Sequence, residues 1–301
     1  MSRMTSLSIL IPEYNETCIE LVRALSEQAA TISSLNYEIL VADDCSTLSA
    51  VVVQNRQINQ IKNCYFLEYP ENFGRAALRN NLADQAHYEN LLFIDSDAQV
   101  FSPTFIRTYV EMAFRAEVVC GGVRNLDHLP SPRVSLRYRY EKAATVVRTV
   151  CYRQKHPYHY FTTFNFLIKR ELFHTIKFDE HCVEYGYEDA LFGVELRERA
   201  IQIRHIDNPL VHTGMDFNEI FLEKTEAALR TLNHLGGKMQ ASAAVSQAVC
   251  RIQQFHLLGV FRFAYKLFVP LLRAQLMSSR PSLTLFKLYK LGYYSTLNEK
   301  R

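Results

Sequence analysis

The sequence predicts an α/β protein with a mostly parallel central sheet flanked by helices. Between residues 7 and 97, short apolar runs alternate with stretches whose apolar residues recur at helical spacing. The run at residues 91–94 is apolar throughout, as expected for a strand buried on both faces of a parallel sheet. Two of the runs end in pairs of acidic residues, at the strand ends where such sheets bind ligands.

The expected elements follow one another in the order strand, helix, strand, strand, helix, strand. The strands are residues 7–12, 37–44, 64–70 and 90–97, and the helices are residues 18–33 and 74–86. Pro12 ends the first strand, since proline cannot donate to a strand ladder, and Gly74 opens the second helix. Alternation at this spacing predicts a parallel sheet covered by helices.

Four carboxylates fall at the carboxyl ends of these strands, namely Asp43, Asp44, Asp95 and Asp97. Asp and Ser are also typical of solvated turns, so a plain turn after residue 94 is one interpretation. The other is a cation site, because hard oxygen ligands one residue apart can hold Mg²⁺ or Mn²⁺ together with a phosphate. Four acids at one sheet edge repel each other unless a cation or a hydrogen-bonding ligand lies among them, which favours the second interpretation.

Two common nucleotide-binding loops are missing from the sequence. No GxGxxG follows the first strand and no GxxxxGK[ST] occurs, so a dinucleotide fold and a P-loop protein are both disfavoured. A phosphate bound here would need another counter-charge, and a metal on the two aspartates would supply it.

Composition places the chain among ordinary globular proteins, with 48% hydrophobic and 22% charged residues in 301. The apolar stretch near the start is too short for a signal peptide, so we expect a cytoplasmic protein. The seven cysteines are odd in number and form no CxxC pair, which indicates reduced thiols. They are Cys18, Cys45, Cys64, Cys120, Cys151, Cys182 and Cys250.

Charge divides the chain into two parts. Residues 1–226 carry 23 Lys and Arg against 30 Asp and Glu, a net charge of −7, whereas residues 227–298 carry nine bases and no acid. We therefore expect an α/β domain at residues 1–226 and a basic helical tail at residues 227–301. The acidic body argues against nucleic acid as a partner, although bases and tyrosines mix in residues 137–160.

The tail has two interpretations. Six of the seven bases within residues 251–290 fall on one narrow arc if the segment is drawn as a continuous helix, with apolar residues around most of the remainder. They are Arg251, Arg262, Lys266, Arg273, Arg280 and Lys287. Pro270 and Pro281 are expected to kink or break that helix. One interpretation is a basic amphipathic series lying peripherally on the inner, anionic face of the cell membrane. The other is a helical hairpin packed on the body with its bases in water.

Five motifs, in order, resemble the family 2 inverting glycosyltransferases, which have the GT-A fold. They are SILIPEYNE (residues 8–16), EILVADDCS (38–46), ENFGRAALRNN (71–81), LLFIDSDAQV (91–100) and GYEDALFGVEL (186–196). Each motif is weak alone, but together they extend the resemblance from residue 7 to about residue 225. Glu13 departs from the family, which more often has a small residue there, and would add negative charge near the nucleotide. Cys45-Ser46 stands where Gly-Ser is commoner, a change expected to alter only a turn.

The resemblance implies a role for each matching residue. Pro12, Tyr14 and Glu16 would wall the nucleotide pocket, and Asp43 and Asp44 would accept hydrogen bonds from base and ribose. Asn72, Gly74 and Arg79 would line the nucleotide or diphosphate side. Asp95 and Asp97 form a DxD motif that would hold Mn²⁺ or Mg²⁺ on the diphosphate, with His212 as a further metal or diphosphate contact. Asp189 matches the general base.

Local sequence leaves other roles open for several of these residues. Glu188 and Asp189 have the pattern of a helix N-cap or first-turn charge. His212 follows a short apolar strand and is equally consistent with a structural histidine. Arg79 fits a surface helix charge as well as an anion contact. Asn165, within an expected strand-to-helix segment at residues 159–172, fits an acceptor-site residue or a buried amide satisfied by backbone.

The function expected from the sequence is transfer of a sugar from a nucleotide-diphospho-sugar, with UDP-sugar as first choice. The acceptor would be a hydroxyl of a saccharide or lipid-linked molecule, in cell-surface polysaccharide or glycolipid synthesis. A sugar nucleotidylyltransferase is an alternative, but it would have a Gly-rich basic stretch after the first strand, and PEYNET has neither feature. A non-catalytic sugar-nucleotide-binding protein is the other alternative.

Overall fold

The computed structural model describes residues 5–181 and 185–297. The chain folds into two compact units. The first comprises Met1–Asn125, Thr145–Val183 and Glu188–Gly214, and the second comprises Leu126–Ala144, Glu184–Tyr187 and Met215–Arg301. The six cysteines in the described part of the chain are free thiols, and Cys182 lies outside that part.

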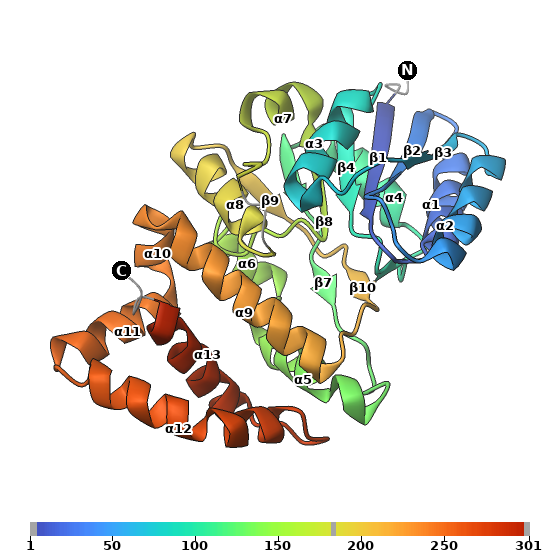
Figure 1. Ribbon diagram of the computed structural model, residues 1–301. Helices are drawn as coiled ribbons and strands as arrows, with labels where there is room; N and C mark the ends of the chain where they lie inside the picture. Colours follow the sequence, from blue (N-terminus) through green and yellow to red (C-terminus); the bar gives the residue numbers. More distant parts are fainter. Residues whose placement is uncertain (1–4, 182–184, 298–301) are drawn as a thin grey trace. The chain divides into compact units, whose positions relative to one another are not determined.

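The first unit is built on a seven-stranded sheet (Figure 1). Its strands are β1 (Thr5–Glu13), β2 (Leu35–Asp43), β3 (Cys64–Glu68), β4 (Asn90–Ile94), β6 (Val118–Cys120), β8 (Asn165–Lys169) and β9 (Ile203–His205), in the order β3-β2-β1-β4-β8-β6-β9. Four of the six pairings are parallel, and β8 alone runs antiparallel, to both β4 and β6. The predicted mostly parallel sheet is confirmed.

Apolar side chains leave this sheet on both faces, which is why helices cover both. The helices of the unit are α1 (Ile19–Ala30), α2 (Ser49–Asn55), η1 (Arg56–Gln60), α3 (Gly74–Gln85), α4 (Phe105–Met112), α6 (Val150–Lys155), α7 (Arg170–Ile176) and α8 (Glu188–Glu198). In β1, Leu7, Ile9 and Ile11 join a core cluster with residues of α1 and α4. Leu10 joins a second cluster with residues of α3, α7 and α8. This two-sided burial explains the unbroken apolar run in the sequence.

A second, small sheet brings distant segments together. Its strands are β5 (Ala98–Gln99), β7 (Val123–Arg124) and β10 (Leu210–His212), in the order β5-β10-β7. β10 pairs antiparallel with β5, so that His212 lies opposite Ala98. This pairing fixes His212 beside the acids that follow β4, although His212 lies more than a hundred residues further along the chain.

Most elements of the first unit lie where the sequence predicted them. The four expected strands correspond to β1, β2, β3 and β4, and the two expected helices to α1 and α3. The expectation that Pro12 ends the first strand is wrong, because β1 continues to Glu13, which pairs with Asp43. The segment at residues 159–172, expected to run from strand into helix, forms β8 followed by α7. The short apolar strand expected before the glycine at position 214 is β10.

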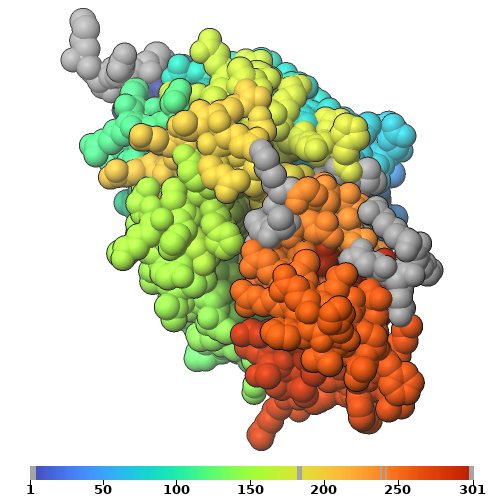
Figure 2. Space-filling view, turned by 90° about the vertical axis from the view of Figure 1, so that its left-hand side faces the viewer, coloured from blue at the N-terminus to red at the C-terminus, as the bar shows by residue number. Residues whose placement is uncertain are grey.

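The second unit is helical. It contains η2 (Pro132–Val134), α5 (Ser135–Ala143), α9 (Asn218–Leu235), α10 (Gly237–Ser242), α11 (Ala244–Gln254), α12 (Leu258–Leu276) and α13 (Leu283–Leu297), while η3 (Ala144–Val146) lies at a boundary between the units in the sequence. Figure 2 shows the later helices in orange and red. Arg273 of α12 donates to Glu226 of α9 and to the hydroxyl of Tyr289 of α13, each at 2.6 Å, and so ties three helices together.

The tail differs from its prediction in one respect. Pro270 neither ends nor interrupts α12, so the expected break at that position is wrong; the chain leaves the helical conformation at residues 255–257 and 277–282 instead. Pro281 does lie in a break. The second unit also takes in residues 126–144 and 215–226, and the predicted domain division after residue 226 stays a prediction. Among the described residues, no helix is long and apolar enough to cross a membrane.

Candidate active site

The acidic ends of β1, β2 and β4 lie at one edge of the main sheet. Glu13 is in register with Asp43 across the β1–β2 pair. On the other side of β1, β4 ends at Ile94, directly before Asp95. Neighbouring parallel strands carry their carboxyl ends to the same edge, so the acids that follow these strands gather there.

Asp44 fixes the start of α3. Its carboxylate accepts hydrogen bonds from the backbone N–H groups of Phe73 at 2.7 Å and Gly74 at 3.0 Å, and the side chain of Asn72 donates to its carbonyl at 2.9 Å. Gly74 has a φ of +79°, a left-handed conformation that favours glycine. Burial raises the pKa of Asp44, and the two N–H groups oppose that rise. Three residues predicted to contact the nucleotide therefore form one hydrogen-bonded group at a helix N-terminus, which favours anions.

Glu13 is a buried carboxyl group with a raised pKa. Its side chain is 2% exposed, and its carboxyl group accepts a hydrogen bond from the N–H of Glu16 at 3.2 Å. Burial raises the pKa of Glu13 to about 8, the N–H of Glu16 opposes the rise, and the charge of Asp43 adds to it. This raised pKa disfavours the negative charge that was expected of Glu13 near the nucleotide, because a buried carboxyl beside another acid favours its protonated form.

The loop after β1 carries the other residues expected to wall the nucleotide pocket. The side-chain oxygen of Asn15 accepts the N–H of Thr47 at 2.9 Å, which joins this loop to the one after β2. Tyr14 is 49% exposed, so its ring is accessible to a ligand. Glu16 is exposed, and Pro12 is half-buried within β1. Their contacts with a nucleotide stay predictions.

Replacing Glu13 with glutamine is expected to flatten the dependence of stability on pH. The folded state holds the Glu13 proton up to about pH 8, whereas an unfolded chain releases it near the ordinary value of 4.5. Stability from this group is fully present below the unfolded pKa and is lost as the pH rises towards 8, by roughly 2–4 kcal/mol. Glutamine cannot ionise, so Glu13→Gln should have the higher melting temperature above pH 8, measured by thermal unfolding from pH 5 to 9.

Exposed Glu16 is the matched control for that experiment. Glu16→Gln changes a neighbouring acid in the same loop, and its melting curve should keep the pH dependence of the unmodified protein. Parallel pH profiles for Glu13→Gln and the unmodified protein would show that Glu13 is already ionised at neutral pH.

The two aspartates of the DxD sequence have different partners. A carboxylate oxygen of Asp95 accepts a hydrogen bond from Arg79 at 2.6 Å. A carboxylate oxygen of Asp97 lies 3.0 Å from Nε2 of His212. Their side chains are 24% and 30% exposed, so both remain accessible to a ligand. The structure thus places His212, itself buried, against Asp97, and its role as a metal or diphosphate contact stays a prediction.

Asp97 is held by the segment that follows β10. Its backbone carbonyl accepts the N–H of Thr213 at 2.9 Å and the hydroxyl of Thr213 at 2.8 Å. A Cβ added at Gly214 would lie 2.1 Å from a carboxylate oxygen of Asp97, so only glycine permits this approach. His212, Thr213 and Gly214 together orient one carboxylate.

Arg79 lies beneath the site and joins the two acidic motifs. Its side chain is 2% exposed; it pairs with Asp95 and lies 3.9 Å from the Glu188 carboxylate, which is also 3.6 Å from Arg75. The buried guanidinium thus lies between acids of two separate motifs. The sequence indicated a surface charge or a diphosphate contact for Arg79. The first is wrong because the side chain is buried, and the second stays a prediction.

Asp189 lies in the first turn of α8, next to Glu188, and its side chain is half-buried. Burial raises the pKa of Asp189 to about 7, the charge of Glu188 adds to the rise, and the N–H of Ala190 and the charge of Arg79 oppose it. Ala190 donates that N–H at 2.7 Å, within the same turn, so Asp189 does take the first-turn position that its sequence also suggested. A carboxyl with a pKa near 7 exchanges its proton readily at neutral pH, as a general base must.

The described residues contain no ready-made group of three or more His, Cys, Asp or Glu side chains that could hold a metal ion. One carboxylate oxygen of Asp95 accepts from Arg79, whereas Asp97 and His212 contact each other directly. The metal role expected for Asp95 stays a prediction. Mg²⁺ in particular needs only one or two protein ligands when a substrate phosphate and water complete its shell. A carboxylate and an imidazole therefore fit a cation shared with a phosphate ligand.

Asn165 is a buried amide with its partners in the fold. It is completely buried; its side-chain oxygen accepts from the hydroxyl of Tyr109, and its amide donates to the carbonyl of Gly122. Of the two roles that the sequence left open for it, the structure shows the structural one.

Sequence reasoning missed Arg75, Thr213 and Gly214. Arg75 lies within a motif already singled out, four residues before Arg79, and this helical spacing places both on one face of α3 towards Glu188. Thr213 and Gly214 directly follow His212, but their contacts with Asp97 depend on the β5–β10 pairing, which the sequence does not indicate.

Solved structures of known proteins share this architecture and define it as a GT-A-type α/β fold. The mannosyltransferase PcManGT from Pyrobaculum calidifontis, in complex with GDP-Man and Mn²⁺, matches with a TM-score of 0.60 and 14% identity over 98% of this chain and 88% of that chain. The crystal structure of S. aureus TarS matches with a TM-score of 0.50 and 20% identity over 76% of this chain and 40% of that chain.

Residues 8–177 match the family model described as Glycosyl transferase family 2. This is more than half of the chain, which therefore belongs to glycosyl transferase family 2. The chain is 34% identical over 106 residues to a poly(ribitol-phosphate) beta-glucosyltransferase from Bacillus spizizenii, a match that covers 34% of this chain and 16% of that protein. It is 33% identical over 94 residues to an uncharacterized glycosyltransferase from Haemophilus influenzae, over 31% of this chain and 37% of that protein.

Proposed function

We propose that this protein is an inverting glycosyltransferase that uses a divalent cation and a nucleotide-diphospho-sugar, with UDP as the nucleotide. The observation that carries the proposal is the arrangement at the sheet edge. Asp97 contacts His212, Arg79 joins Asp95 to Glu188, and Asp189 follows directly. This arrangement occurs in a chain of glycosyl transferase family 2.

The nucleotide would bind where Asp44, Asn72 and Gly74 form their hydrogen-bonded group. Asp44 uses its oxygens to hold two N–H groups, but a carboxylate has about four acceptor positions and can accept further hydrogen bonds from base or ribose. Exposed Tyr14 offers a ring that could stack on the base. The N-terminus of α3 favours the negative charge of the diphosphate.

Asp97 and His212 would hold the cation, Mn²⁺ or Mg²⁺. When bound, the cation supplies Lewis-acid stabilisation of the charge that develops on the leaving diphosphate. The protein's part is to present one carboxylate and one imidazole, and the contacts of Thr213 and Gly214 fix the position of the carboxylate. The Mn²⁺ in the solved structure of PcManGT, which shares this fold, supports the choice of ion.

Asp189 would act as general base. As the acceptor hydroxyl attacks, its proton passes to the Asp189 carboxylate. The bond from the anomeric carbon to the diphosphate oxygen breaks, and the bond to the acceptor oxygen forms on the opposite face of the sugar. This single displacement inverts the anomeric centre and requires no nucleophile from the protein. Arg79 and Glu188 are positioning residues, because their own charges lie near the Asp189 carboxylate and influence its ionisation.

The acceptor in this proposal is a hydroxyl group of a saccharide or a lipid-linked molecule. The similarity to a poly(ribitol-phosphate) beta-glucosyltransferase supports a hydroxyl-rich polymer of the cell surface as the acceptor class. We place the reaction in the cytoplasm, where nucleotide sugars are made.

A panel of nucleotide sugars tests the proposal. UDP- and GDP-sugars are compared by thermal shift with Mn²⁺, with Mg²⁺ and with a chelator. The correct donor should raise the melting temperature only when the cation is present, with a stabilisation of about 2.7 kcal/mol at a hundredfold excess over its Kd. Slow release of nucleoside diphosphate from that donor should accompany binding. A protein that no nucleotide sugar stabilises would contradict the proposal, and binding without any turnover would favour the non-catalytic alternative.

A further inference from the structure

Helix α12 of the second unit carries an exposed apolar stripe. Val260, Phe263, Leu267, Phe268 and Leu271 are between 52% and 72% exposed. Their spacing places them along one side of the helix. Contiguous exposed apolar surface of this kind marks a docking site, because leaving it in water costs free energy.

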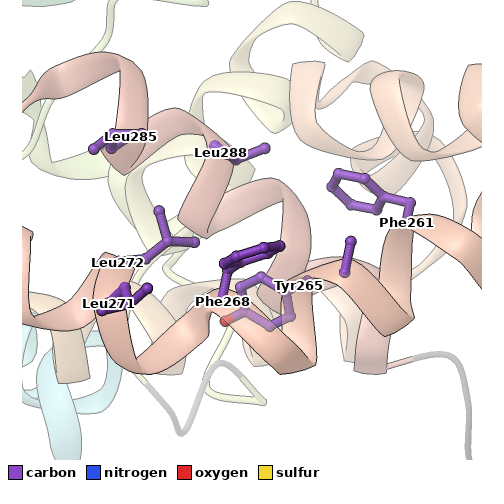
Figure 3. Close-up of a pocket in the computed structure, with 8 residues that line it drawn as sticks. Phe261, Tyr265, Phe268, Leu271, Leu272, Leu285 and Leu288 are labelled. Atoms are coloured by element: carbon purple, nitrogen blue, oxygen red, sulfur yellow. The ribbon is translucent and has the colours of Figure 1, made fainter.

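The same side of α12 opens into a cavity of about 300 Å³ between α12 and α13. Figure 3 shows side chains of both helices around it. The lining residues are Phe261, Ala264, Tyr265, Phe268, Leu271, Leu272, Leu285 and Leu288, and almost all of their surface towards the cavity is carbon. A cavity with so few hydrogen-bonding atoms selects a hydrocarbon group over a polar one.

Charge around the stripe decides what kind of surface fits it. No Asp or Glu occurs between residues 227 and 298, whereas nine Lys and Arg do. Arg251, Lys266, Arg280 and Lys287 of this set are exposed. The segment that carries the stripe has bases and no acid in its sequence, which complements a bilayer that contains anionic lipids, since hydrocarbon and negative headgroups lie side by side there.

Two of the bases expected to face lipid are used inside the unit instead. Arg262 donates to the carbonyl of Ser295 at 2.7 Å, and Arg273 pairs with Glu226. The single arc of bases expected from the sequence is therefore wrong, because the six bases are distributed over α11, α12, α13 and the turn before α13. The apolar stripe on α12, which is not part of that arc, is therefore the stronger indication of contact with lipid.

We propose that α12 is a membrane-docking helix that lies in the interface of an anionic bilayer, with its apolar stripe inserted and an acyl chain in the cavity between α12 and α13. Insertion removes the exposed apolar side chains of the stripe from water. The cavity accepts an acyl chain, which needs no polar group of the protein to orient it. A helix with one apolar side and one polar side is suited to lie in the plane of the interface. This inference goes beyond the proposed transfer reaction and does not depend on it.

The absence of tryptophan from the chain makes a direct test available. Phe268→Trp places a single reporter in the stripe, and Tyr140→Trp places one on α5 of the same unit, where Tyr140 packs against Phe221 and Phe286. Both full-length proteins are mixed with phosphatidylcholine vesicles, with and without phosphatidylglycerol, whose acyl chains are brominated. The Phe268→Trp emission should be quenched when phosphatidylglycerol is present, and the Tyr140→Trp emission should not change.

Two further variants separate the stripe from the cavity. Phe263→Glu combined with Leu267→Glu should weaken vesicle binding by roughly 100-fold, because two inserted apolar side chains are lost. Ala264→Phe fills the cavity and keeps every charge, so it should reduce quenching of a Phe268→Trp reporter at saturating vesicle. All variants should keep cation-dependent binding of the nucleotide sugar, which reports on the first unit independently.

Three results would overturn the proposal. The first is failure of the full-length protein to bind any vesicle. The second is equal quenching of the reporters at Phe268 and Tyr140. The third is a concentration-dependent dimer in solution that the Phe263→Glu and Leu267→Glu substitutions dissociate, which would assign the stripe to a second copy of the chain.

Discussion

Asp97→Asn is expected to lose cation-dependent binding of the nucleotide sugar. The substitution keeps the shape of the side chain and removes a charged ligand from the proposed cation site. The other ligand there is His212, whose Nε2 lies 3.0 Å from the Asp97 carboxylate. An amide oxygen is a far weaker ligand for Mn²⁺ or Mg²⁺ than a carboxylate, so the cation would no longer be held against the diphosphate. Calorimetric titration of UDP with and without Mn²⁺ measures the effect, expected to be at least 100-fold in affinity, or about 2.7 kcal/mol.

Ser96→Ala is the matched control, because Ser96 lies between the two aspartates and the change leaves both carboxylates in place. It should bind UDP with Mn²⁺ as the unmodified protein does. Asp97→Asn with an unaltered, Mn²⁺-dependent affinity for UDP would show that the cation is held elsewhere.

The parts of the fold that the sequence predicted are those with a local cause. β1, β2 and β4 are apolar runs buried on both faces of the sheet, and such runs are visible without any knowledge of their partners. The position of Asp43, Asp44, Asp95 and Asp97 follows from the same cause, since parallel strands end at one edge. The resemblance of the motifs to a known family then assigned these residues to one site.

The parts that could not be predicted depend on long-range pairing. Arg79 joins Asp95 to Glu188, which is more than a hundred residues further along the chain, and only the packing of α3 and α8 against the sheet determines this contact. The protonation of Glu13 likewise depends on burial beside Asp43. Neither is encoded in the residues next to these positions.

The tail shows the limit of periodicity. An arc of bases computed for one continuous helix assumes that the helix continues, but the chain leaves the helical conformation at residues 255–257, where His256 has a φ of +58°. A break in the helix changes the direction in which all later side chains point, so bases before and after it no longer share one arc. Pro270, the strongest local signal of a break, lies inside α12 because the packing of Tyr265, Leu272 and Leu276 on either side of it holds the helix together.

Asp189→Asn is expected to separate chemistry from binding. An amide of the same shape cannot take the acceptor's proton, so kcat should fall by ~10²–10⁴, the usual contribution of a general base. The Kd of the donor should change little, since in the proposed site Asp97 and His212 would hold the cation. Steady-state rates and calorimetry on one protein preparation measure the two quantities. Weakened donor binding with intact chemistry would assign Asp189 to the donor site instead.

The pH dependence of the rate provides the sharper test of the base. Asp189 must be ionised to accept a proton, and its pKa is raised to about 7, so kcat/KM should increase with pH through that value and level off above it. Glu188→Gln removes a charge that raises the pKa of Asp189, so its profile should move to lower pH while Asp189 still acts as base. In Asp189→Asn the acidic limb should disappear, because no group with that pKa remains to be deprotonated. A limb that persists unchanged in Asp189→Asn would locate the base on another residue.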